Sequence, residues 1–170
     1  MTFKAPFFST PMVVEAQWLD FNGHLNMAFY NVLFDRGVDQ IFDQLGLNAE
    51  YRTATGNTTF SAEFHLCYIR ELYVSDWVQA TFQLLDHDEK SFHFYQELWH
   101  EDGWLAATGE GLGLHIDRSG PNVTAMPEDI RANFAKLAEA HSKMRRPERV
   151  GRQMGIRRKN RKNRGKINRI

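Results

Sequence analysis

Four residues that can take part in acyl chemistry lie close together near the start of the chain: Asp20, Gly23, His24 and Asn26. A carboxylate can attack a carbonyl carbon or deprotonate a water molecule beside it. The unpaired N–H groups at the start of a helix carry partial positive charge and can stabilise an oxyanion on that carbonyl. If a helix begins directly after this loop, the four residues predict attack on an acyl group.

The neighbours of Asp20 allow two interpretations. Gly23 lets the backbone approach a substrate closely, and His24 and Asn26 can orient the substrate or a water molecule. Asp20 and Asn26 are equally good capping residues, so a loop that only starts a helix is the more common explanation of these residues alone. Both interpretations stay open at this level.

The hydrophobic pattern predicts the elements that must position this loop. Apolar residues recur mostly three or four apart over residues 25–45, which predicts a helix of about five turns. Asn26 is its expected N-cap and Gly46 its expected stop. Alternating residues predict four antiparallel strands, with a tight turn at Asp102-Gly103, and a second apolar stripe predicts a short helix over residues 127–141. The strands are expected at residues 58–69, 77–85, 91–99 and 104–116.

This order predicts an α+β domain in which an antiparallel sheet wraps around a long central helix. The domain is expected to span residues 1–142, which carry 8 Lys/Arg and 20 Asp/Glu. Residues 143–170 carry 13 Lys/Arg and one acid, so they form a basic C-terminal tail. Beyond residue 156 the tail has almost no apolar residues, which predicts disorder or contact with an acidic partner.

The loop and the first helical turn together carry a family likeness. Residues 18–30 read Trp-Leu-Asp-Phe-Asn-Gly-His-Leu-Asn-Met-Ala-Phe-Tyr. This segment resembles the signature of the 4-hydroxybenzoyl-CoA thioesterase-like superfamily, in which Asp20, Gly23 and Tyr30 match the family's Asp, Gly and Tyr. The likeness covers roughly residues 10–140 and points to the bacterial thioesterases associated with carnitine and betaine metabolism. It implies a single hotdog domain and an enzyme that hydrolyses acyl-CoA thioesters.

The resemblance also implies roles for the loop. Asp20 would be the nucleophile or general base, and backbone N–H groups around Gly23 and Leu25 would bind the oxyanion. His24 and Asn26 depart from the benzoyl-CoA type, so the division of catalytic work among Asp20, His24 and Asn26 stays open. The active site of the family lies at a dimer interface, which implies a homodimer or a dimer of dimers.

Substrate recognition is expected from four further residues. If the acyl group carries a trimethylammonium, as betainyl-CoA does, a carboxylate with nearby aromatic rings is the expected receptor. Glu63, with Trp18 and Tyr30, is the candidate for this receptor, although Glu63 is equally explained as an exposed residue of a half-buried strand. Arg70 is a candidate for binding the CoA phosphates.

The remaining expectations concern partners and compartment. The substrate is a short or polar acyl-CoA, with coenzyme A as part of the substrate, no separate cofactor and no metal site. Residues 1–10 lack the layout of a signal peptide and no apolar run could span a bilayer, which predicts a cytoplasmic protein without a membrane partner. Two alternatives remain: a hotdog enoyl-CoA hydratase or dehydratase, and a non-catalytic protein that binds acyl-CoA or nucleic acid. Binding of nucleic acid is disfavoured because the end of the tail lacks aromatic residues.

Overall fold

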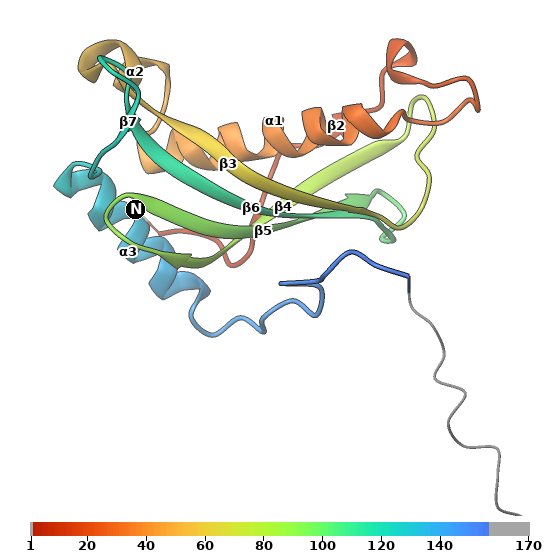
Figure 1. The fold of residues 1–170 in the computed structure, drawn as a ribbon. Coiled ribbons are helices and arrows are strands. Elements are labelled where there is room, and N and C mark those ends of the chain that lie inside the picture. Colours follow the sequence, from red (N-terminus) through yellow and green to blue (C-terminus); the bar gives the residue numbers. More distant parts are fainter. Residues whose placement is uncertain (1, 157–170) are drawn as a thin grey trace, which may run out of the picture.

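The chain forms a curved antiparallel sheet with a long helix lying across its concave face (Figure 1). The computed structural model describes residues 2–156. The helices are α1 (Met27–Leu45), α2 (Ala49–Thr55) and α3 (Glu128–His141), and a 3-10 turn spans Ala16–Trp18. The strands are β1 (Phe7–Phe8), β2 (Met12–Val13), β3 (Asn57–Tyr68), β4 (Trp77–His87), β5 (Ser91–His100), β6 (Leu105–Asp117) and β7 (Asn122–Val123).

The sheet has the order β1-β4-β5-β6-β3, and every neighbouring pair runs antiparallel. Short pairings add β2 to β4 and β7 to β6. The predicted α+β arrangement, an antiparallel sheet around a long central helix, is confirmed. Because β3 lies at the end of this order, one edge of a 12-residue strand has no partner within residues 2–156.

The helix α1 begins and ends where the sequence predicts. Asn26 is its N-cap, and the Asn26 side chain accepts a hydrogen bond from the Ala28 N–H at 3.0 Å. Gly46 ends the helix in a left-handed conformation with φ of 88°, which glycine adopts without a Cβ clash. No helix in the described part of the chain is long and apolar enough to cross a membrane.

One apolar stripe holds α1 against the sheet. Leu33, Ile41 and Leu45 are fully buried, and burial of each such side chain contributes roughly 1.5–3 kcal/mol. Gly37 lies on the same stripe, where a Cβ would come within 2.7 Å of the Ala80 Cβ on β4. The missing side chain therefore lets the helix approach the sheet closely, and this fixes where the loop before the helix lies.

The strand β3 departs from the strict alternation of faces that its sequence predicts. Its register shifts between Ser61 and Glu63, so that Ser61 pairs with Gly113 and Phe64 pairs with Gly111. Two residues that pair directly in an antiparallel ladder point to the same face of the sheet. Gly111 and Gly113 are two apart on β6, so they also point to the same face. The bulge therefore puts Ser61 and Phe64 on the same side of the sheet, the side that faces α1.

The segment after α3 runs along the outer face of the sheet (Figure 1). The Gln83 Nε2 donates a hydrogen bond to the Arg145 carbonyl at 3.4 Å, and the Gly151 N–H donates to the Glu110 carboxylate at 2.7 Å. The first part of the predicted basic tail thus contacts the sheet. The predicted disorder beyond residue 156 lies outside the described residues.

A buried histidine joins both ends of the domain to the sheet. His141, the last residue of α3, accepts a hydrogen bond from the Leu84 N–H at its Nδ1, 2.9 Å away. Its Nε2 lies 3.0 Å from the Lys4 carbonyl, so Nε2 carries the proton and donates it there. Burial lowers the pKa of His141 below its ordinary value, although the bond to Lys4 works in the opposite direction. The folded protein therefore favours the neutral imidazole.

Acidification is expected to weaken the fold through this histidine. A group whose folded-state pKa is lowered contributes stability above its ordinary pKa of about 6.5 and loses it as the pH falls through the folded-state value. Urea unfolding at pH 7 and pH 5 should therefore show a larger loss of unfolding free energy in the wild type than in His141→Gln, whose amide can accept and donate but does not titrate. Equal losses in the two proteins would contradict this role for His141.

Candidate functional site

The loop before α1 is closed by its own backbone. The Asp20 N–H donates to the His24 carbonyl at 3.0 Å, and the Gly23 N–H returns to the Asp20 carbonyl at 3.0 Å. Leu19 and Leu25 form an isolated antiparallel bridge at the base of the loop. Gly23 has φ of 82°, a conformation that side chains disfavour. The loop is therefore a defined turn that places Asp20 and His24 side by side.

The Asp20 carboxylate is partly exposed, and only one of its two oxygens has a hydrogen-bond partner. Its Oδ1 accepts the Asn22 N–H at 2.8 Å and lies 3.7 Å from the Nδ1 of His24. Its Oδ2 has no hydrogen-bond partner within residues 2–156. The His24 ring also meets the Tyr73 ring edge-on, with centroids 6.0 Å apart. A free carboxylate oxygen beside an imidazole can attack a carbonyl carbon or take a proton from water.

The backbone donors left free in the loop and at the start of α1 are not the ones predicted. The N–H of Gly23 donates within the loop, and the N–H of Leu25 donates to the Leu72 carbonyl at 2.8 Å. The N–H groups of Gly23 and Leu25, which were predicted to bind the oxyanion, therefore already donate within the chain. The N–H groups without a partner among the described residues of the loop and helix start are those of Phe21, His24 and Met27.

Asn26 acts structurally through its side-chain oxygen. That oxygen caps the helix by accepting the Ala28 N–H, and the backbone carbonyl of Asn26 accepts the Phe29 N–H at 2.9 Å. The backbone N–H of Asn26 donates to the Trp18 carbonyl at 2.9 Å. Only the side-chain NH2 group of Asn26 remains to contact a substrate. Asn26 can therefore donate a hydrogen bond to it, while its side-chain oxygen is already engaged.

Trp18 is buried beneath the loop. Its ring stacks on Phe29, with centroids 5.5 Å apart, and the guanidinium of Arg36 lies 4.8 Å from the ring centroid. Arg36 is held in place by Glu15, at 3.1 Å between Nη1 and Oε1. These contacts occupy the indole, so Trp18 supports the loop in this chain instead of presenting a free ring to a ligand.

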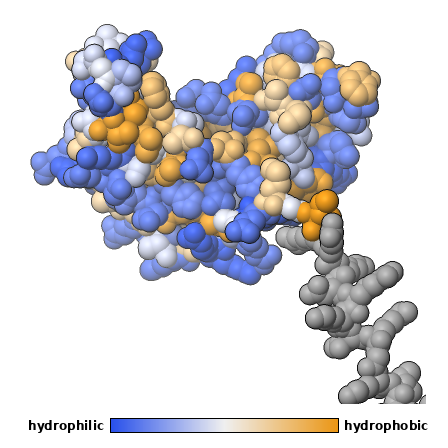
Figure 2. All heavy atoms as spheres, viewed as in Figure 1, coloured by the Kyte–Doolittle hydropathy of each residue, from blue (hydrophilic) through white to orange (hydrophobic). Residues whose placement is uncertain are grey.

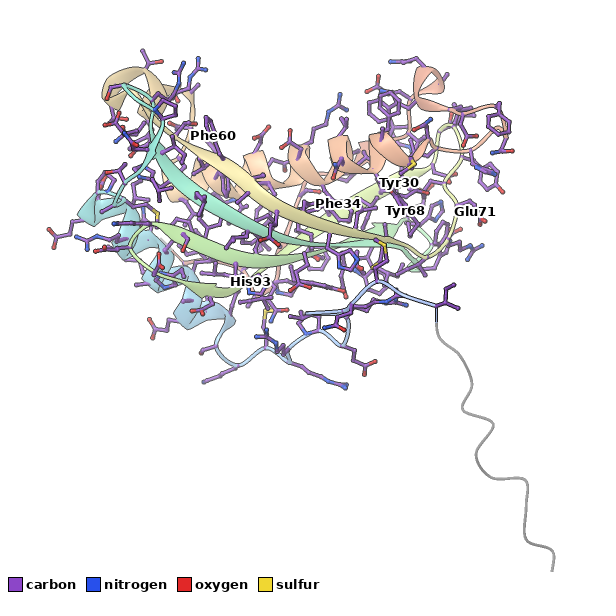
Figure 3. All side chains as sticks on the ribbon, in the orientation of Figure 1. Tyr30, Phe34, Phe60, Tyr68, Glu71 and His93 are labelled. Atoms are coloured by element: carbon purple, nitrogen blue, oxygen red, sulfur yellow. The ribbon has the colours of Figure 1, made fainter. Side chains whose placement is uncertain are left out.

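Two tyrosines meet at the first turn of α1 (Figure 3). The rings of Tyr30 and Tyr68 lie edge-on, with centroids 5.1 Å apart, and the Tyr68 hydroxyl donates to the Met27 carbonyl at 3.1 Å. The hydroxyl of Tyr30 lies 3.5 Å from the Arg70 carbonyl. Burial raises the pKa of Tyr30 to about 12, so its phenol stays neutral near pH 7. The sequence singled out Tyr30 and missed Tyr68.

Arg70 lies just beyond β3 and close to the helix start. Its guanidinium sits over the Trp104 ring at 4.0 Å from the centroid, a favourable cation–π geometry. Two residues later, the Leu72 carbonyl accepts the Leu25 N–H of the loop. Arg70 is thus an exposed cation at the edge of the loop.

Glu63 lies on the other side of the sheet. It is exposed in a shallow hollow on the outer face together with His93 and Glu110, whose Nε2 and Oε1 atoms are 2.8 Å apart. Figure 3 places His93 on this outer side and Tyr30 near α1. Within one chain, the structure therefore does not bring Glu63 together with Trp18 and Tyr30.

A cavity of about 730 Å³ opens between α1, α2 and β3. Figure 2 shows a notch with exposed hydrophobic residues between the two raised ends of this face of the molecule. The cavity contains aromatic rings, carboxylates of α1 and one amide of β5, and these were not predicted as a group. No group of three or more His, Cys, Asp or Glu side chains in the described chain could hold a metal ion.

Known proteins share this arrangement. The model of the thioesterase-like superfamily matches residues 14–134. A betainyl-CoA thioesterase from Pseudomonas aeruginosa is 35% identical over 150 residues, which cover 88% of this chain and 93% of that protein. An L-carnitine dehydrogenase/betainyl-CoA thioesterase from Rhizobium meliloti is 31% identical over 85% of this chain, but the match covers only 29% of that longer protein.

A solved structure agrees with these relatives. A hypothetical protein from Staphylococcus aureus, determined in complex with CoA, superposes with a TM-score of 0.85 and 28% identity, covering 92% of this chain and 99% of that one. The chain therefore belongs to the thioesterase-like superfamily, which confirms the predicted class of a hotdog-fold acyl-CoA thioesterase.

Proposed function

We propose that this protein is a homodimeric thioesterase that hydrolyses betainyl-CoA to glycine betaine and CoA. The observation that carries the proposal is the Asp20 carboxylate, which has a free oxygen in the same loop as the unpaired N–H of His24, directly before the unpaired N–H of Met27 at the helix start. The similarity to the betainyl-CoA thioesterase of Pseudomonas aeruginosa, which extends over 93% of that protein, supports the choice of acyl group.

The chemistry follows from the geometry of the loop. The thioester carbonyl oxygen binds to the N–H groups of His24 and Met27, where the positive end of the helix stabilises the developing oxyanion. Asp20 either takes a proton from the attacking water or attacks the carbonyl carbon itself. In both routes a C–O bond forms, the C–S bond breaks, and CoA leaves as a thiolate that takes up a proton. In the second route the acyl group is first held on Asp20 as an anhydride, and a water molecule then hydrolyses it to release the acid and restore the carboxylate. His24, 3.7 Å from Asp20, orients the carboxylate.

The edge of β3 is the proposed dimer interface. β3 is a 12-residue strand whose unpaired edge exposes backbone N–H and C=O groups that can pair with another strand. The simplest partner is the same strand of an identical copy. Phe60 and Tyr68, at 49% and 48% exposure, add apolar surface along the same strand. A two-fold axis through the middle of β3 would join the two sheets antiparallel and bury this surface.

Arg70 is the proposed contact for the CoA phosphates. It is exposed, it lies at the edge of the loop, and a guanidinium matches the geometry of a phosphate. Its cation–π contact with Trp104 holds the side chain in place without removing its charge.

A panel of acyl-CoAs tests the proposed function. Thiol release should be fastest with betainyl-CoA and slower with acetyl-, benzoyl- and palmitoyl-CoA, because only the first carries the cationic head group. Crotonyl-CoA serves as the control for hydratase activity, and its enoyl absorbance should not change. Folded dimeric protein that releases no thiol from any member of the panel would refute the proposal.

A further inference from the structure

A buried amide borders the cavity between α1, α2 and β3. Gln96 on β5 has 0% exposure and lines this cavity. Its Nε2 donates to the Phe34 carbonyl at 3.1 Å. Because a carbonyl can only accept, this contact distinguishes the amide nitrogen of Gln96 from its oxygen. The Oε1 of Gln96 has no partner among the described residues. A buried acceptor left unpaired costs about 1–3 kcal/mol, so a ligand that carries a donor or a positive charge is favoured there.

Two carboxylates of α1 face the same cavity. Asp35 and Asp39 are one turn apart on the helix, and both line the cavity. Within residues 2–156 neither forms an ion pair, although Arg52 lines the cavity as well. Burial, and secondarily the neighbouring Asp35 carboxylate, raises the pKa of Asp39 above its usual range. A cation bound between them would relieve the repulsion between the two carboxylates.

The walls of the cavity are aromatic. Phe34, Phe60 and Phe64 are among the residues that line it, and Figure 3 shows Phe60 at the α2 end of β3, far from Tyr68. A quaternary ammonium cannot donate a classical hydrogen bond, so proteins bind it through aromatic faces, carboxylates and carbonyl dipoles. The cavity holds all three kinds of group, which is the composition expected for a trimethylammonium receptor.

The Asp39 carboxylate in the cavity and the loop of the same chain are too far apart to hold the two ends of one small acyl group. Asp39 comes 12 residues after Met27 in α1, which places it about 18 Å along the helix axis. The loop lies at the Tyr68 end of β3, since the Tyr68 hydroxyl bonds to the Met27 carbonyl, and the cavity lies beside residues 58–61. Antiparallel pairing of β3 with its copy would put the Tyr68 end of one strand beside the cavity end of the other.

We propose that the cavity of each subunit binds the trimethylammonium head of the acyl group whose thioester lies at the loop of the second copy, with Asp35, Asp39 and the Gln96 Oε1 facing the cation. The inference rests on the proposed function and names the receptor that makes the enzyme select a cationic acyl group. Specificity and catalysis then come from different subunits of the dimer.

The first experiment compares two substrates of the same shape. In 3,3-dimethylbutanoyl-CoA a carbon replaces the nitrogen of betainyl-CoA, so only the charge differs. The wild type should prefer betainyl-CoA, and in Asp39→Asn the ratio of the two kcat/KM values should fall at least tenfold. Glu101→Gln removes an exposed carboxylate outside the cavity and should keep the wild-type ratio. An unchanged ratio in both Asp35→Asn and Asp39→Asn would overturn the receptor, while thiol release from betainyl-CoA would still support the proposed function.

The second experiment tests whether the receptor and the loop belong to different subunits. Asp20→Asn and Asp39→Asn chains are co-expressed with different affinity tags, and the mixed dimers are purified on both tags. One of the two sites in each mixed dimer would then combine an intact loop with an intact cavity. These dimers should recover the wild-type preference for betainyl-CoA. A preference no higher than that of the Asp39→Asn homodimer would overturn the shared site.

Discussion

Replacing Asp20 by Asn is expected to lower kcat for the best acyl-CoA by at least about 10²-fold while leaving the fold and the oligomeric state unchanged. The amide has almost the same shape, and its oxygen can still accept the Asn22 N–H that Asp20 accepts at 2.8 Å. It cannot take a proton from water or form an acyl intermediate. Thiol release measures the loss, and thermal unfolding checks the fold.

A matched control separates chemistry from loop structure. Asp117 makes the same kind of turn as Asp20, since its Oδ1 accepts the Ser119 N–H at 2.8 Å two residues on, but it lies at the far end of β6. Asp117→Asn should keep wild-type turnover. Near wild-type turnover in Asp20→Asn would rule out a chemical role for this carboxylate and return the loop to a purely capping function.

The loop and α1 could be predicted because their signals are local. An N-cap at Asn26, a stop at Gly46 and an apolar stripe between them are contained within one stretch of chain. The short helix α2 was not predicted, because none of its seven residues is buried and it therefore has no apolar stripe. The bulge at Ala62 also gives no sign in the sequence, since alternation looks the same with one extra residue.

The remaining parts of the site depend on contacts between distant segments. The amide of Leu25 is not free because it donates to Leu72, far along the chain. The cavity combines α1, α2, β3 and β5, so Gln96 and Asp39 could not be linked to the site from spacing. Glu63 was singled out for its charge within a half-buried strand, a pattern that does not tell which face of the sheet receives the side chain.

The glycines of β6 position the aromatic layer under α1. Rings of the neighbouring strands occupy the space over Gly109, Gly111 and Gly113. A Cβ on Gly111 would lie 2.3 Å from the Phe94 Cζ. Phe94 cannot move aside easily, because it is 3% exposed and stacks on Phe82 with centroids 5.0 Å apart. The position therefore accepts only glycine without displacement of the ring.

Replacing Gly111 by Ala is therefore expected to destabilise the fold by about 1–3 kcal/mol or more, because the added methyl overpacks a rigid layer. The melting temperature should fall by about 2–4 °C for each kcal/mol. Gly120→Ala is the matched control, since its Cβ would come no closer than 3.7 Å to the Asn122 side chain. A Gly111→Ala protein as stable as Gly120→Ala would show that the Phe94 ring moves aside without a cost in unfolding free energy.

A second substitution links this packing to the site. Phe94→Leu should recover part of the stability lost in Gly111→Ala, because a smaller side chain leaves room for the methyl group, and a double-mutant cycle measures the coupling. Phe94 also lines the cavity beside Gln96, so a displaced ring would narrow the proposed receptor. Gly111→Ala should therefore lower the preference for betainyl-CoA even at temperatures where it remains folded. A preserved preference would mean that the aromatic layer supports the fold without shaping the cavity.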